Sequence, residues 1–120
     1  MENAGPRTEP PVYVPTAWTL APRTDEAIAR AARACRETAA LAAGKRRLAL
    51  VTALCQVAAE RLATRDEQSP VLLSLTARTV DAAARDVTAD DLEAVLFGSA
   101  CRRCAEACRT ALVSLFLEGY

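Results

Sequence analysis

The chain has 120 residues, enough for one compact domain with its own apolar core and too few for two ordinary domains. Fifteen basic and fifteen acidic side chains cancel, which argues against a nucleic-acid groove and against binding to an anionic membrane surface. Hydrophobic residues make up 52% of the sequence, with four glycines and 4% aromatic residues, so the composition favours packed helices over a sheet.

The start of the chain and its cysteine content predict a cytoplasmic protein with reduced thiols. The first residues, MENAGPRTEPP, lack the basic region and apolar stretch that mark a secretory signal. No apolar run reaches about 18 residues, so no membrane-spanning helix is expected. Five cysteines are an odd number, which does not suit a fully paired disulfide framework.

Residues 1–23 are predicted to form an extended or disordered arm. Five of the six prolines lie there, and each proline removes a backbone donor and fixes one dihedral angle. Tyr13, Val14 and Trp18 also lie in this segment, and the alternative is that they clip it onto the helices, because aromatic side chains gain from burial. The sequence leaves both arrangements open.

Residues 24–120 are predicted to form an all-α, antiparallel four-helix bundle, because apolar residues recur at helical spacing between short polar links. The first three helices are expected over residues 24 to about 42, about 45 to 64 and 69 to about 86, with Gly44 ending the first. Their inward positions are Ile28, Ala32, Cys35, Ala39 and Ala42, then Leu48, Val51, Leu54, Cys55, Ala58 and Leu62, then Leu72, Leu73, Thr76, Val80 and Ala83.

A fourth helical stretch is expected from Thr88 to about Leu117. At a rise of about 1.5 Å per residue it would be about 45 Å long, against about 30 Å for the second helix. We therefore expect a break at Gly98 and Ser99, which would make residues 89–97 a short helix across one end. One continuous, overhanging helix is the alternative.

The run CRRCAEACR is the most informative part of the sequence. On a helix its thiols, Cys101, Cys104 and Cys108, project from one face because they are spaced i, i+3 and i+7. Ala111 and Leu115 continue the same seam. Such a stripe either fills the core with small hydrophobic side chains or presents thiolates to a soft metal ion.

The depths of the cysteines depend on the expected break. Cys35 and Cys55 each lie about ten residues from Gly44, so both are expected about 15 Å below that turn. With a new helix at Ser99, Cys108 reaches the same depth and three to five thiols can cluster. With a continuous helix, the last three cysteines would lie well below the first two.

The predicted metal is copper(I), with Cys101, Cys104, Cys108, Cys35 and Cys55 as candidate ligands. Copper(I) accepts two or three thiolates, which suits a helical core lined with thiols. Zinc is the second choice, because it prefers four tetrahedral ligands held on turns, and iron–sulfur clusters come last because their ligands usually lie in loops.

The gaps in CRRCAEACR and its Cys104–Ala105 pair resemble the last helix of the cysteine-rich copper storage proteins. The resemblance implies a four-helix bundle whose inward thiols take up copper(I), with Cys101, Cys104 and Cys108 as ligands and a homo-oligomeric assembly. In this chain the third helix has no cysteine and the first two have one each, which indicates a thiol-depleted member of low capacity.

The predicted function is therefore copper(I) binding in the cytoplasm, of a storage or buffering kind. The alternative is a metal-free structural or interaction bundle that kept the fold and lost most ligands. An enzyme is not expected: the chain has no His, so a cysteine nucleophile would lack its usual base.

Overall fold

The structure is a computed structural model that describes residues 24–64, 67–87 and 91–119. Within these ranges the chain is all-helical, as predicted, with four α-helices and no strand. The elements are α2 (Thr24–Ala42), the short 3-10 helix η2 (Arg46–Leu48), α3 (Ala49–Leu62), α4 (Ser69–Arg85) and α5 (Leu92–Gly119). The predicted arm, residues 1–23, lies outside the described residues.

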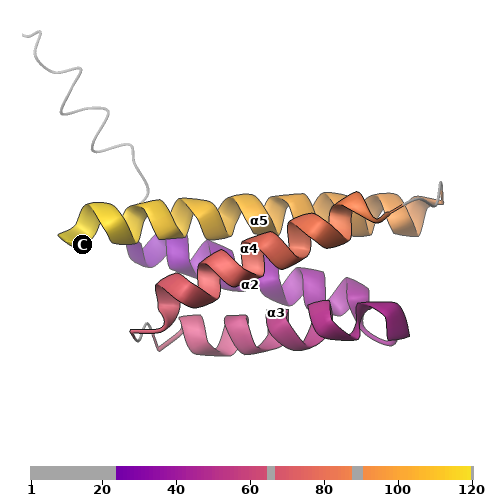
Figure 1. The fold of residues 1–120 in the computed structure, drawn as a ribbon, viewed down its shortest axis with the longest axis horizontal. Helices are drawn as coiled ribbons and strands as arrows, with labels where there is room; N and C mark the ends of the chain where they lie inside the picture. The colour runs from indigo at the N-terminus through magenta and orange to yellow at the C-terminus, as the bar shows by residue number, and fades with distance from the viewer. Residues whose placement is uncertain (1–23, 65–66, 88–90, 120) are drawn as a thin grey trace, which may run out of the picture.

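Helix α5 organises the packing. It runs along one side of the structure and contacts both α4 and α2, while α2 also packs on α3 (Figure 1). Helices α3 and α4 contact each other less extensively. An ion pair between Arg109 and Asp81 ties α5 to α4. None of the helices in the described part of the chain is both long and apolar enough to span a membrane.

The inward face of α2 shows why this sequence forms a packed helix. Asp25 and Glu26 lie in its first turn, where negative charge favours the helix dipole. Just beyond its last turn Gly44 has a φ of +81°, a conformation that costs a residue with a Cβ atom more than it costs glycine. The predicted stripe is confirmed, because all of its members are buried: Ile28, Ala32, Cys35, Ala39 and Ala42.

The predicted break at Gly98 and Ser99 is wrong, because α5 is continuous through both residues. A Cβ atom added at Gly98 would lie 3.8 Å from its nearest neighbouring side chain, so packing at this position does not require a glycine. Within the helix, the Ser99 hydroxyl accepts a hydrogen bond from Arg103 at 2.7 Å. The helix begins later than expected, at Leu92, where Asp91 Oδ1 accepts a hydrogen bond from the Ala94 N–H at 2.8 Å.

Two leucines on α4 provide a test of this packing. Leu73 has no exposed surface, whereas 49% of Leu75 is exposed. Leu73→Ala is expected to lower the free energy of unfolding by about 2–5 kcal/mol, because it leaves a cavity in the core. Leu75→Ala is expected to change it by less than about 1 kcal/mol. Urea unfolding of both variants measures the difference, and equal effects would contradict the assigned inward face of α4.

Candidate metal centre

Three cysteine side chains from two helices meet in the core. Cys35 lies in the middle of α2, and Cys104 and Cys108 lie one turn apart on α5. All three are buried, and their Sγ atoms lie within 4.8 Å of one another. The i, i+4 spacing places both α5 thiols on the face that packs against α2.

The spacing of the sulfur atoms is close to what a bound ion requires. The Sγ atoms of Cys35 and Cys104 are 3.7 Å apart and share a hydrogen bond. Thiolate sulfur lies about 2.3 Å from zinc, and an ion at that distance in the plane of three sulfurs would space them about 4 Å apart. Small side-chain adjustments would therefore let the three thiolates enclose one ion.

Hydrogen bonds make Cys104 the preferred thiolate. They hold the pKa of Cys104 below its ordinary value, and the donors are, in order of effect, the thiols of Cys108, Cys35 and Cys55. Burial acts in the opposite direction. The pKa of Cys35 and that of Cys108 lie above the ordinary range, chiefly because each thiol shares its proton with Cys104. The cluster therefore gives up its first proton from Cys104.

The other two predicted ligands lie outside this group of three. Cys55 on α3 is buried, and hydrogen bonds to Cys104 and Cys35 raise its pKa, so it is an adjacent fourth thiol. Cys101 is buried one turn before Cys104 on α5. Its pKa is raised to about 12, first by burial and then by the negative charge of Cys104. All five cysteines are free thiols.

The thiols converge although α5 is continuous, contrary to the expected consequence of an unbroken helix. Cys104 lies 12 positions after Leu92, and Cys35 lies 9 positions before Gly44. The difference of three positions corresponds to about 4.5 Å along the helix axis. Because α5 begins at Leu92 and not at Thr88, the axial distance between Cys104 and Cys35 is small enough for their side chains to meet.

Thr38 is a residue of the site that the cysteine pattern does not predict. Its buried hydroxyl donates to the Ala34 carbonyl at 2.9 Å and approaches the Ala100 carbonyl at 3.4 Å, which links α2 to α5. It also contributes to the lowered pKa of Cys104. The sequence feature that could indicate Thr38 is its position three residues after Cys35, which places both on the same helical face.

The raised pKa values predict that alkali destabilises the metal-free protein. Thiols of the unfolded chain ionise near pH 8.5, while four of the five buried thiols keep their protons to higher pH. The unfolded state then binds fewer protons, so stability falls as the pH rises above about 8.5. Cys104, whose pKa is lowered, takes no part in this decline, because its contribution to stability is fully present above about pH 8.5 and is lost as the pH falls through its folded pKa.

The contribution of Cys101 can be measured separately. Its folded pKa of about 12 predicts a loss of about 1.4 kcal/mol per pH unit between about pH 8.5 and 12. Cys101→Ala should make the alkaline decline shallower by that amount. Urea unfolding at a series of pH values measures the slope, and an unchanged slope would show that this thiol ionises as readily in the folded state as in the unfolded one.

Comparison with known proteins adds no relative: no family model, no curated protein and no solved structure matches this chain.

Proposed function

We propose that this protein binds copper(I) in a low-capacity site and holds or buffers one ion per chain, with Cys35, Cys104 and Cys108 as ligands. The observation that supports this most is the buried group of three thiols within 4.8 Å of one another. The donor set is soft sulfur, and the chain has no His to offer an imidazole. Copper(I) suits two or three thiolates, whereas structural zinc usually takes four ligands.

The burial of the three thiols favours holding an ion over catalysis at it. Catalytic metal sites keep an open position for water or substrate, but none of these three side chains is exposed. Ligating thiols must lose their protons, so binding releases protons and weakens as the pH falls. The lowered pKa of Cys104 favours the deprotonated form of one of the three ligands before an ion binds.

The bundle arrangement belongs to the same proposal. We infer that the helices run antiparallel around the thiols, because residues from the start of α3, the end of α4 and the start of α5 line one groove. The resemblance of residues 101–109 to the last helix of the copper storage proteins supports the choice of metal. Cys55 would then lie beside the bound ion without ligating it.

A competition titration tests the proposal. Reduced protein is titrated with copper(I) in the presence of a chromophoric copper(I) chelator, and zinc is titrated in parallel. We expect one tightly held copper(I) per chain and weaker zinc binding. Less than one copper(I) per chain would contradict the proposal, and tighter zinc binding would assign the thiols to zinc.

The second candidate is a metal-free interaction or assembly bundle, and one observation favours it. Large apolar side chains are exposed on α3, α4 and α5: Leu50, Val57, Val71, Leu75, Leu92, Val95, Leu96, Val113, Phe116 and Leu117. Six of the ten lie on α5, at helical spacing near its two ends. Exposed apolar side chains that gather into a patch are typical of a homo-oligomer or a partner-binding protein. Light scattering of the metal-free protein tests the assembly function. A strict monomer would contradict that function and would leave the copper-binding proposal unaffected.

A further inference from the structure

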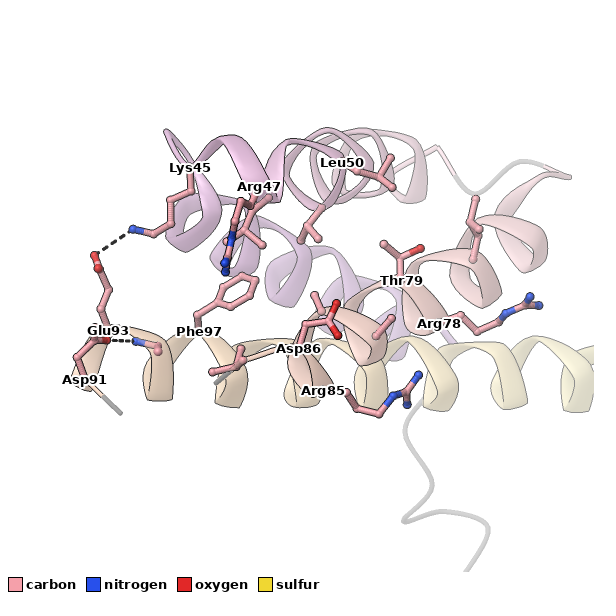
Figure 2. A pocket seen from close by; sticks show the side chains of 17 residues that line it. Lys45, Arg47, Leu50, Arg78, Thr79, Arg85, Asp86, Asp91, Glu93 and Phe97 are labelled. Atoms are coloured by element: carbon pink, nitrogen blue, oxygen red, sulfur yellow. Dashed lines mark hydrogen bonds and ion pairs between the residues drawn. The ribbon is translucent and has the colours of Figure 1, made fainter. Parts of the chain in front are cut away.

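A groove of about 1070 Å³ opens where α3 begins, α4 ends and α5 begins (Figure 2). Lys45 and Glu93 form an ion pair of 3.3 Å at one end of the groove. Phe97, of which only 5% is exposed, forms part of its apolar lining, and Figure 2 shows its ring rising from α5 toward Arg47. The proposed metal site makes no use of this groove.

One face of α5 connects the groove to the thiol cluster. Phe97, Cys101, Cys104 and Cys108 follow at intervals of four, three and four residues, and all are buried. Residues at these spacings share a helical face. Cys101 therefore lies about 6 Å along the axis from Phe97 and about 4.5 Å from Cys104. On α5 it is the thiol between the groove and the proposed ligands, and on α3 Cys55 follows the groove-lining Val51 by the same four residues.

The largest aliphatic side chains of the core lie on the side of the cluster away from the groove. Buried alanines occur on both sides, but the four Leu and Ile side chains that are buried among the described residues lie away from the groove: Ile28, Leu62, Leu73 and Leu115. Toward the groove, Phe97 and the smaller Val51 and Val80 are buried. The groove side therefore has fewer large aliphatic side chains along a route to the thiols.

We propose that copper(I) reaches its site through this groove and that Cys101 is a relay thiol, a role that rests on the proposed copper-binding function. The carrier is a small organic thiol, because copper(I) is soft and the groove is large enough for such a molecule. The route explains why a fifth buried thiol stands outside the three ligands, on the side that faces the groove.

Two ligand exchanges describe the transfer. In the first, the carrier's sulfur–copper bond breaks, a bond forms between copper and Cys101 Sγ, and the Cys101 proton passes to the departing thiolate. In the second, the bond between copper and Cys101 Sγ breaks as a bond to the Cys104 thiolate forms, and Cys101 takes up the proton that Cys108 loses when it joins the ion. Copper remains in the +1 state throughout, so neither an oxidant nor a reductant is needed.

The test compares the rate of loading with its end point. Full-length reduced protein is mixed with the copper(I) complex of glutathione, and copper–thiolate absorbance is followed in a stopped-flow instrument. Cys101→Ala is expected to slow loading about tenfold, equivalent to about 1.4 kcal/mol in the activation barrier, with the final stoichiometry retained. Phe97→Leu should speed loading, because a smaller side chain leaves the route wider. Val113→Ala, on the exposed face of α5, is the matched control.

The outcomes separate the relay from the site itself. An unchanged rate in Cys101→Ala, or a loss of affinity as large as that of Cys104→Ala, would overturn the relay. If Cys101→Ala does not fold, Cys101→Ser provides the same comparison. Wild-type protein that takes up no copper(I) at the end point would instead overturn the proposed function.

Discussion

Replacing Cys104 by alanine is expected to lower the affinity for copper(I) by at least about a hundredfold. Loss of a residue that only supports a metal ligand typically costs about 10–100-fold, and Cys104 is itself a proposed ligand. Its sulfur lies 3.7 Å from that of Cys35 and accepts hydrogen bonds from the neighbouring thiols, so its removal also takes away the preferred thiolate. Competition with a copper(I) chelator measures the affinity.

A control keeps this loss distinct from unfolding. Cys104→Ala removes one buried sulfur atom, which should cost on the order of 1 kcal/mol in stability and leave the helices intact. Val113→Ala changes an exposed position on the same helix and should bind copper(I) like the wild type. If Cys104→Ala stays helical and keeps wild-type affinity, the three-thiol site is wrong.

Copper(I) is expected to raise the melting temperature by about 10–20 °C when its free concentration is about one hundred times the dissociation constant. A ligand that binds only the folded state then adds about 2.7 kcal/mol to the free energy of unfolding. For a domain of this size, each kcal/mol raises the melting temperature by roughly 4–8 °C. Circular dichroism in a chelator-buffered copper(I) solution measures the shift.

The double variant Cys35→Ala, Cys104→Ala is the control for this experiment. It leaves one of the three proposed ligands, Cys108, and should show almost no stabilisation at the same free copper(I) concentration. An equal shift in wild type and double variant would mean that copper(I) acts elsewhere on the chain.

The inward faces of the helices could be predicted from the sequence because burial follows the helical period closely. Cys35 falls in the buried stripe of α2, and Cys104 and Cys108 fall in that of α5. The two opposite faces of an amphipathic helix differ in polarity along its length, so the sequence pattern identifies which side chains enter the core. The all-helical fold and the entry of thiols from α2 and α5 into the core follow from this pattern.

The course of α5 could not be predicted, because local preferences at Gly98 are weak. A glycine inside a helix costs only about 1 kcal/mol relative to alanine, which packing on α2 and α4 can outweigh. The pattern also could not say which thiols would meet. Cys101, Cys104 and Cys108 share one face but spread over about 10 Å along the axis. The sliding of α5 against α2 decides which of them reach Cys35, and helical periodicity does not specify that offset.

X-ray absorption spectroscopy at the copper edge, on protein loaded with one equivalent of copper(I), counts the sulfur atoms bound to the ion. We expect three sulfur neighbours around copper, with no nitrogen or oxygen ligand, and the loss of one sulfur neighbour in Cys108→Ala. A first shell that contains nitrogen or oxygen, or a wild-type shell that Cys108→Ala leaves unchanged, would contradict a site built from Cys35, Cys104 and Cys108.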